Sequence, residues 1–320
     1  MNLKAVHRLS LILASSIVLY SCTKEDLKEC SLQLQLKYDY SMEDEVMNFV
    51  DLYVFDKQDE FIELLQVDLP KFTDNYKIAV PHYYKDKTLV VWAGETRESY
   101  STSPLQVGDA MDSLMLKHVT IDNTSTQKLS NLFHGGEELM TFDGVNHTHT
   151  IDFTRTDNRI NLSLQDANNK NMEIEGKYDV KLTACNAVYS SDHMIASNSP
   201  RITYLPTNYA STPKRETRTK QTSAHLHTLR LHELYREDVK LTIYNTEQQQ
   251  YITFGGEPEL KLIEYLLQTT PNETSAQAYL DNKSEWNISF AVAEDAPGDK
   301  DIALNITING WVIWFNDIEL

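Results

Sequence analysis

The chain has 320 residues and a formal net charge of −18 at neutral pH. With 41% hydrophobic and 24% charged residues it can bury a core, which excludes a broadly disordered protein. The acidity argues against nucleic-acid binding, because that function needs a basic surface to displace the counterions of the phosphates. Seventeen tyrosines and four tryptophans with only ten glycines are typical of a strand-rich protein.

Residues 1–21 are predicted to be a secretory signal of the lipoprotein type. A short basic stretch precedes an apolar run from Leu9 to Tyr20, which is too short to span a membrane comfortably. The sequence Leu-Tyr-Ser directly before Cys22 is similar to the bacterial lipobox, in which the cysteine is acylated and becomes the mature N-terminus. We therefore expect Cys22 to carry the lipid. The alternative is an ordinary signal peptide with an incidental cysteine.

An N-terminal β domain is predicted over residues 22–153. Its first strand alternates strictly between apolar and polar residues, and Cys30 is in phase with the buried face. The stretch Thr-Leu-Val-Val-Trp-Ala-Gly is apolar enough to be a central strand. The predicted strands are 30–40, 49–55, 61–67, 76–80, 88–92 and 148–153, with a short helix at 110–117 and a turn at 132–136.

A C-terminal β domain is predicted over residues 154–320. Residues 205–224 are polar and rich in Thr and Ser, so we expect a long exposed loop there. Residues 258–268 have apolar side chains at helical spacing and Pro258 in the first turn, which predicts a short helix. The predicted strands are 159–164, 178–184, 226–231, 239–244, 286–292 and 303–315. Many short strands with turns between them predict two β-sandwiches in tandem.

Several motifs follow one another in a distinctive order. They are the lipobox, Cys-x-Leu-x-Leu-x-Leu-x-Tyr-Asp-Tyr (30–40), Val-Asp-Leu-Tyr-Val-Phe-Asp (50–56), Leu-Val-Val-Trp-Ala-Gly (89–94), Leu-Phe-His-Gly (132–135), Thr156 to Ile160 and Ile-Asn-Gly-Trp (308–311). Each motif is mostly a strand pattern, but together they resemble the FimB-like family. The members of that family are the anchor subunits of type V fimbriae in Bacteroidales.

The resemblance implies an all-β fold of two tandem transthyretin-like Greek-key sandwich domains, with no enzymatic activity and no cofactor. It implies a lipoprotein at the surface of the outer membrane, held there by lipid on Cys22, that ends a fimbria and binds its stalk subunit. The sequence Thr-Lys-Glu-Asp after Cys22 resembles the signals that export Bacteroidota lipoproteins to the cell surface.

In this family, stalk subunits lose their first strand by cleavage after an arginine, and the C-terminal strand of a neighbour fills the groove that opens. This sequence has no arginine between Cys22 and Arg97. We therefore expect the first strand to be retained and fibre growth to end at this subunit.

The last ten residues are the candidate donor or docking strand toward the shaft. The alternative is that this strand pairs inside its own sandwich. The residues expected to make the contact are Trp311, Ile313, Phe315, Ile318 and Leu320.

Two groups of residues resemble metal sites without completing one. His225, His227 and the nearby His232, like the pair His147 and His149, lack a Cys or acidic partner at a recognisable spacing, so we interpret them as surface histidines. Residues 294–301 contain four acidic residues but do not match an EF-hand, so we expect a solvated acidic turn.

Cysteine and tryptophan leave further alternatives open. Cys30 and Cys185 either form a disulfide between the two predicted domains or remain two buried free thiols. A second hypothesis for function is a surface lipoprotein that binds glycans on exposed aromatic side chains. Its candidate platforms are Trp92, Trp286, Trp311 and Trp314, although their alternating strands predict that they belong to the core.

Overall fold

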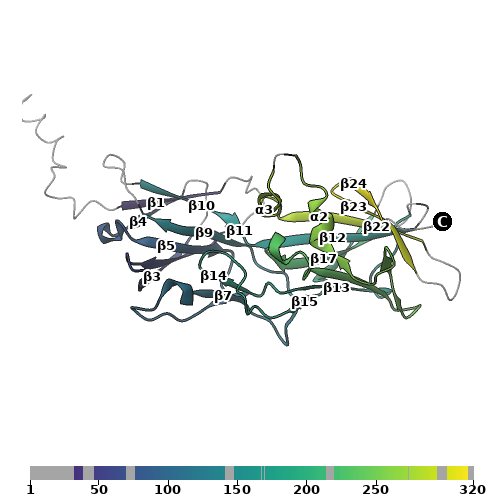
Figure 1. The fold of residues 1–320 in the computed structure, drawn as a ribbon, viewed down its shortest axis with the longest axis horizontal. Helices are drawn as coiled ribbons and strands as arrows, with labels where there is room; N and C mark the ends of the chain where they lie inside the picture. The colour runs from purple at the N-terminus through teal and green to yellow at the C-terminus, as the bar shows by residue number, and fades with distance from the viewer. Residues whose placement is uncertain are drawn as a thin grey trace, which may run out of the picture.

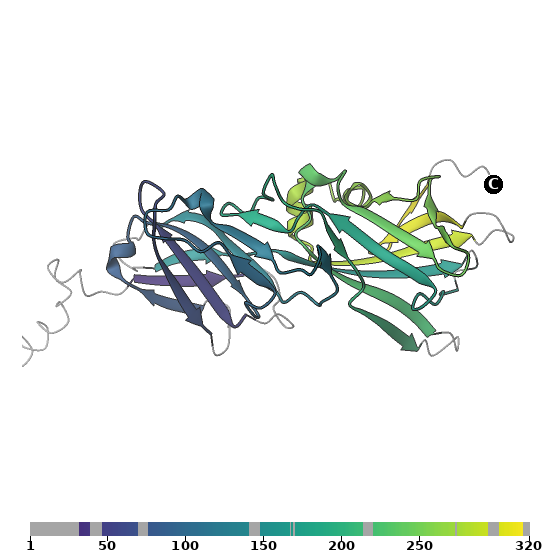
Figure 2. The same cartoon turned by 90° about the horizontal axis from the view of Figure 1, so that it is seen from below.

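The computed structural model describes residues 32–38, 47–69, 76–140, 148–166, 168, 170–213, 220–272, 274–293 and 301–315. Strands dominate these residues, which confirms the prediction of an all-β protein. Figures 1 and 2 show an elongated molecule with the strands of the N-terminal half at one end of the long axis and those of the C-terminal half at the other. The division into two tandem domains at residues 153 and 154, and their transthyretin-like Greek-key topology, stay predictions.

Two sheets pack face to face in the N-terminal half. The first contains β1 (Leu32–Lys37), β4 (Tyr76–Val80) and β10 (Thr148–Asp152) in the order β10-β1-β4; the second contains β2 (Phe49–Phe55), β3 (Phe61–Asp68), β5 (Thr88–Gly94), β9 (Leu132–Leu139) and β11 (Thr154–Arg155) in the order β11-β9-β5-β2-β3. Leucines of β1 meet valines and leucines of β2 and β5 in a core between the sheets. The other face of the second sheet is also largely covered, so every residue of β2 is buried.

Two larger sheets form the C-terminal half. One contains β12 (Asp157–Asp166), β16 (Asn208–Pro213), β17 (Lys220–Leu229), β20 (Thr253–Phe254), β22 (Glu285–Ala293), β23 (Ile302–Ile308) and β24 (Trp311–Trp314); the other contains β8 (Thr124–Ser125), β13 (Tyr178–Ala184), β15 (Ile202–Tyr204), β18 (Lys240–Asn245), β19 (Gln250–Tyr251) and β21 (Leu260–Lys261). The order in the first is β16-β17-β12-β22-β23-β20, with β24 also on β23. Two short helices accompany these sheets, α2 (Leu262–Leu267) and α3 (Ala276–Asp281).

The two halves exchange short strands. β8 lies between the N-terminal strands β5 and β9 in the chain but pairs with β15 in the C-terminal half. In the opposite sense, β14 (Val188–Ser190) pairs with β7 (Met115–His118), which also pairs with β6 (Tyr100–Thr102). Segments of each half therefore complete sheets of the other, and one hydrophobic cluster continues across the boundary.

A buried ion pair lies where the chain passes between the halves. Arg155 at the end of β11 donates to both carboxylate oxygens of Asp157 at the start of β12, over 3.0 and 2.8 Å. Asp157 also accepts a hydrogen bond from the backbone N–H of Leu132, and Arg155 donates to the side chain of Asn131. Since both charges are buried, these bonds replace the water that each group loses on folding.

Three predicted elements were wrong. The helix at 110–117 is a 3-10 turn, η3 (Met111–Ser113), followed by β7, because pairing with β6 and β14 outweighs the weak helical pattern. The exposed loop at 205–224 is largely the hairpin of β16 and β17, at one edge of the seven-stranded sheet. The turn at 132–136 is part of β9. Within the described residues the other 3-10 turns are η2 (His82–Tyr84) and η4 (Glu233–Tyr235).

Candidate functional site

β1 fills the centre of its sheet. It pairs with β10 in parallel on one side and with β4 in antiparallel on the other. Leu32, Leu34 and Leu36 are at most 1% exposed, so the strand is held by both ladders and by the core. Cys22 and Cys30 lie outside the described residues.

The direction of the strands sets the two ends of the molecule. β1 runs parallel to β10, and β10 leads through β11 into the C-terminal half, so Leu32 lies at the end of β1 that points away from that half. β24 is antiparallel to β23, β23 is antiparallel to β22, and β22 is parallel to β12. β24 therefore runs away from the N-terminal half. Figures 1 and 2 show β1 and β24 toward opposite ends of the long axis.

β24 lies at the edge of the seven-stranded sheet. It pairs with residues 305–308 of β23, which is the internal pairing that was one of the two alternatives for this strand. Ile313 packs against the core, and Phe315 is buried with its ring 5.8 Å from that of Phe254 and 5.3 Å from that of Tyr265. Ile318 and Leu320 lie outside the described residues.

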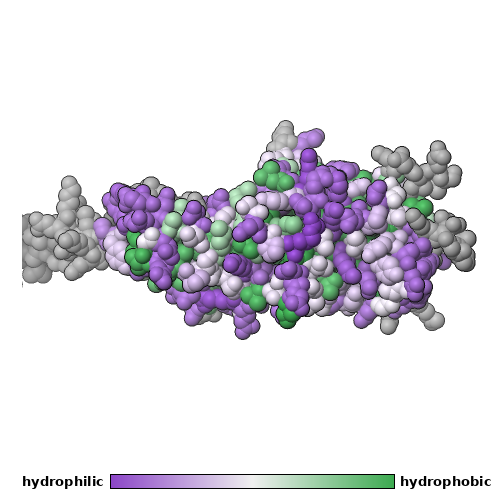
Figure 3. Space-filling model, turned by 60° about the horizontal axis from the view of Figure 1, so that its bottom comes forward, coloured by the Kyte–Doolittle hydropathy of each residue, from purple (hydrophilic) through white to green (hydrophobic). Residues whose placement is uncertain are grey.

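The exposed side of β24 is apolar. Trp311, Val312 and Trp314 are 68%, 53% and 65% exposed. Among the described residues only β23 pairs with this strand, so its second backbone edge has no partner in that part of the chain. An exposed apolar edge is a template for pairing with a strand of another chain. The face of the molecule in Figure 3 is mostly hydrophilic, with hydrophobic side chains in small separate patches.

The four tryptophans therefore divide into two pairs. Trp92 and Trp286 are 2% and 0% exposed and belong to the core, as their strands predict. The same prediction was wrong for Trp311 and Trp314, because within the described part of the chain their strand has a neighbour, β23, on one side only.

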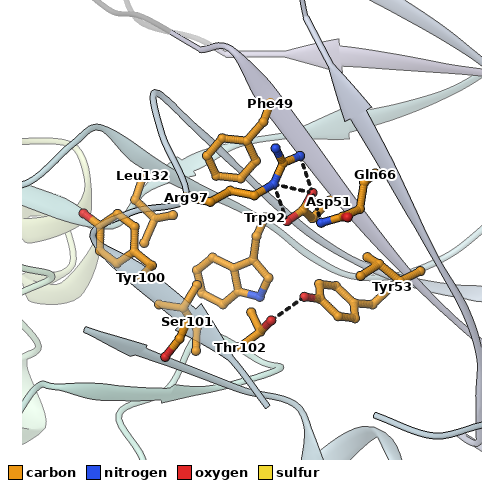
Figure 4. A pocket seen from close by; sticks show the side chains of 12 residues that line it. Phe49, Asp51, Tyr53, Gln66, Trp92, Arg97, Tyr100, Ser101, Thr102 and Leu132 are labelled. Atoms are coloured by element: carbon orange, nitrogen blue, oxygen red, sulfur yellow. Dashed lines mark hydrogen bonds and ion pairs between the residues drawn. The ribbon is translucent and has the colours of Figure 1, made fainter. Parts of the chain in front are cut away.

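A pocket of about 190 Å³ lies on the face of the second N-terminal sheet that is turned away from β1 (Figure 4). Trp92 on β5, Tyr53 on β2 and Tyr100 on β6 supply aromatic surface, and Leu132 contributes to the lining. The Tyr53 hydroxyl donates to Thr102 Oγ1 over 2.7 Å. Burial raises the pKa of Tyr53 to about 12, so this hydroxyl stays protonated at neutral pH.

An arginine closes one side of the pocket. Arg97 lies over the ring of Phe49 at 4.3 Å and donates to both oxygens of Asp51, by 2.7 Å at the shortest. Its third contact is Asp68 at 3.0 Å. Hydrogen bonding to Asp51, the largest cause, and to Asp68 raises the pKa of Arg97 above its ordinary value.

The predicted surface histidines lie largely inside the protein. His227 and His232 are buried and His225 is half-buried; His227 lies opposite Arg159 near the start of β12, at the junction of the halves. The Nδ1 atom of His225 lies 2.6 Å from Asn161 Oδ1, and the amide of Asn161 donates to Glu285 and Asn287. Among the described residues no group of three or more His, Cys, Asp and Glu side chains could hold a metal ion. His147 lies outside those residues.

A second histidine cluster, which the sequence did not predict, lies at the junction of the halves. The rings of His134 on β9 and His193 stack with centroids 4.6 Å apart. His134 Nε2 lies 2.8 Å from the carbonyl of Ser191, and His193 Nε2 lies 2.9 Å from the hydroxyl of Thr156. Burial lowers the pKa of His134 to about 4 and that of His193 well below 6.5, so both rings are neutral at pH 7.

The remaining expected residues are only partly described. Cys185 is half-buried and forms no disulfide within the described part of the chain, and because Cys30 lies outside it the pairing stays a prediction. Of the acidic segment, Asp301 is described, and it is buried rather than solvated. It accepts a hydrogen bond from Asn245 over 2.8 Å, which explains how its charge is tolerated. No helix among the described residues is long and apolar enough to cross a membrane.

Comparison with known proteins identifies relatives. Residues 26–317 match the family of "Fimbrillin-A associated anchor proteins Mfa1 and Mfa2". No curated protein sequence matches the chain. A structure from Bacteroides thetaiotaomicron, described as a candidate polysaccharide-binding protein, has a TM-score of 0.74 and 24% identity over 90% of this chain and 99% of its own.

Two more structures share the fold. A candidate adhesin from Bacteroides ovatus has a TM-score of 0.72 and 23% identity over 92% of this chain and 98% of its own. The fimbrial anchor protein Mfa2 from Porphyromonas gingivalis has a TM-score of 0.66 and 14% identity over 89% of this chain and all of its own (100%). At these identities the likeness shows a common fold, whereas the family match covers nearly the whole chain and carries the assignment.

Proposed function

Because this chain belongs to the family of fimbrillin-A associated anchor proteins, which are structural proteins and not enzymes, we propose that it is the lipid-linked subunit at the base of a fimbria. In this role it ends fibre assembly, holds the shaft to the outer membrane at the cell surface, and binds the stalk subunit by β-strand addition. The observation that carries the proposal is the separation of two ends: β1 begins at one, and the exposed apolar edge of β24 lies toward the other.

Membrane attachment is assigned to Cys22. Acyl chains partition into the bilayer by about 0.8 kcal/mol per buried CH₂, and more than one chain is needed for stable anchoring. Leu32 follows Cys22 by ten positions, which span at most about 35 Å when extended. The start of β1 points away from the C-terminal half, which favours a membrane on that side.

Replacing the acylated thiol tests the lipid assignment. In Cys22→Ser, we expect the protein to leave the membrane fraction and fimbriae to be shed into the medium. Cys185→Ser is the matched control, because it removes a thiol without touching the leader, and it should remain in the membrane fraction. Continued membrane attachment of Cys22→Ser would contradict the lipid assignment.

Termination of growth is assigned to the retained first strand. β1 occupies the position between β4 and β10, with its three leucines in the core, and no arginine lies between Cys22 and Arg97. A strand from another subunit finds no open groove at that position. This supports a subunit that accepts no strand from another subunit at its N-terminal end.

Shaft binding is assigned to β24. Its free edge offers backbone donors and acceptors to an added strand, and Trp311, Val312 and Trp314 offer apolar contact area. The double variant Trp311→Ser/Trp314→Ser should stay in the membrane while the cell loses attached fimbriae. Leu234→Ser, which removes another exposed apolar side chain, is the control and should keep them. Normal attachment in the double variant, and after deletion of 311–320, would refute docking through this strand.

A further inference from the structure

The pocket in Figure 4 is independent of β1 and β24, so the anchor role does not explain it. Its volume of about 190 Å³ matches one ring-sized group, since a cavity of about 150 Å³ already holds benzene. The lining comes from β2, β3, β5 and β9 of one sheet and β6 and β7 of another, with Arg97 from the segment between β5 and β6. A site on such elements is preformed and loses little entropy when a ligand binds.

The floor and walls of the pocket present apolar faces. Figure 4 shows the indole of Trp92 between Tyr53, on the side of Thr102, and Tyr100. Leu132 and Leu64 add aliphatic surface, and Leu64 is 38% exposed at the rim. Flat aromatic surface favours a ligand that also has a flat apolar face.

The rim and floor also hold polar groups with unused hydrogen-bonding capacity. Thr102 Oγ1 accepts from Tyr53, but no acceptor for its own proton occurs among the described residues. Gln66 uses its amide nitrogen on Asp51, while its carbonyl oxygen accepts nothing from the described residues. Trp92 Nε1 is buried without a partner there, and Figure 4 draws it on the side of the ring that faces Tyr53 and Thr102.

The charges of the pocket disfavour ionic ligands. Arg97 lies between Asp51 and Asp68, so the three side chains together carry one negative charge, in a chain whose net charge is −18. An anionic ligand is repelled. A cationic ligand meets a carboxylate and a Phe49 ring that Arg97 already occupies.

We infer that this pocket binds one uncharged, polyhydroxylated six-membered ring, the chemistry of a neutral hexose unit. Such a ring has an apolar face of C–H groups for the aromatic walls and hydroxyl groups that both donate and accept. It would engage Thr102 and the carbonyl of Gln66 together. A purely aromatic side chain from a partner protein fills the same volume but leaves these groups unpaired, which costs binding free energy.

A ligand panel tests the inference on the full mature chain. Methyl glucoside, methyl galactoside, methyl mannoside, glucuronate and p-cresol are titrated separately, and binding is followed by saturation-transfer NMR and calorimetry. We expect at least one neutral methyl hexoside to bind with a dissociation constant in the millimolar range, and glucuronate and p-cresol to bind at least tenfold more weakly.

Two surface variants locate the site. Thr102→Val and Gln66→Leu keep the approximate shape of the pocket and should each weaken hexoside binding by about tenfold, the effect of one lost hydrogen bond. Thr242→Val on β18 in the C-terminal half is the matched control and should bind as the wild type does. Equal binding in both pocket variants, or preferential binding of p-cresol, would overturn the inference, as would the absence of binding by all three hexosides.

Discussion

β1 and β24 are short strands near the two ends of the chain, and their environments are opposite. β1 has a partner on each side and three leucines in the core. β24 pairs with one strand among the described residues, and three of its four residues are more than half exposed. The strand with the more apolar sequence, Trp-Val-Ile-Trp, is the exposed one, while Leu-Gln-Leu-Gln-Leu-Lys is buried on its apolar face.

The contrast shows that position in the sheet, and not composition, decides which strand is buried. A central strand gains two hydrogen-bonded ladders and a covered face, whereas an edge strand keeps unpaired backbone groups. Natural edges usually carry charged residues or proline. An edge made of Trp, Val and Ile is a hazard for aggregation unless another chain covers it, so β24 is the part of the surface whose sequence is hardest to explain without a partner.

The largest expected effect comes from placing a charge in β1. Leu34→Asp buries an unpaired carboxylate at a site with 0% exposure, so we expect a loss of more than about 5 kcal/mol of unfolding free energy. Val312→Asp makes the same kind of change on β24 and should cost about 1 kcal/mol. Urea denaturation followed by circular dichroism measures both. Similar losses in the two variants would remove the contrast between the strands.

The junction between the halves gives the next largest effect. Asp157→Asn leaves Arg155 as a buried charge without its carboxylate, and we expect a loss of about 3–5 kcal/mol in unfolding free energy. Asp152→Asn is the control, because its partner Lys37 on β1 is solvent-exposed; it should change stability by at most about 1 kcal/mol. If β1 and β24 belong to one cooperative unit, the variant Asp157→Asn unfolds in a single transition at a lower urea concentration than the wild type. Two separate unfolding transitions would show that the halves unfold independently.

Low pH is expected to change the stability of the fold without changing the charge of the docking strand, since β24 carries no titratable side chain. His134 is neutral in the folded protein down to about pH 4 but takes up a proton near pH 6.5 when unfolded. The unfolded state therefore binds more protons in this window, and stability falls as the pH is lowered from 6.5 to 4, by roughly 3 kcal/mol from this group. The His134→Gln variant should lose less stability over the same range. Parallel curves for the two proteins would assign the acid sensitivity to other groups.

The smallest change in stability is expected at the exposed end. Trp314→Ser removes a side chain that is 65% exposed, so the unfolding free energy should stay within about 0.5 kcal/mol of the wild type. Self-association of the purified protein should fall, because the apolar edge is its best site for non-specific pairing. Analytical ultracentrifugation measures this. A large loss of stability would mean that Trp314 supports the fold and is not reserved for a partner.

Sequence patterns predicted the strands whose own residues determine their environment. The bounds of β2, β4 and β13 agree with the structure, because strict alternation or an unbroken apolar run identifies a strand without reference to its neighbours. β9 was missed because His-Gly-Gly reads as a turn. Gly135 is needed for another reason: a Cβ atom there would lie 2.5 Å from Ile151 of the facing sheet.

The pocket and the histidine cluster could not be predicted from the sequence, because each combines side chains from segments that lie far apart in the chain. Asp51 and Arg97 are 46 positions apart, and the Thr156–His193 contact spans 37. β7 likewise became a strand through pairing with β14 from the other half. The exposure of Trp311 and Trp314 depends on which strand is last in the sheet, a property that an alternating pattern does not contain.

The direction of β1 has a mechanical consequence. β1 lies roughly along the long axis, its ladder hydrogen bonds run across that axis, and its start faces away from β24 (Figures 1 and 2). A force that pulls the start of β1 away from the far end of the molecule acts along the strand and loads these hydrogen bonds in shear, all at once. Peeling would break them one after another at far lower force, so this geometry is suited to bearing tension.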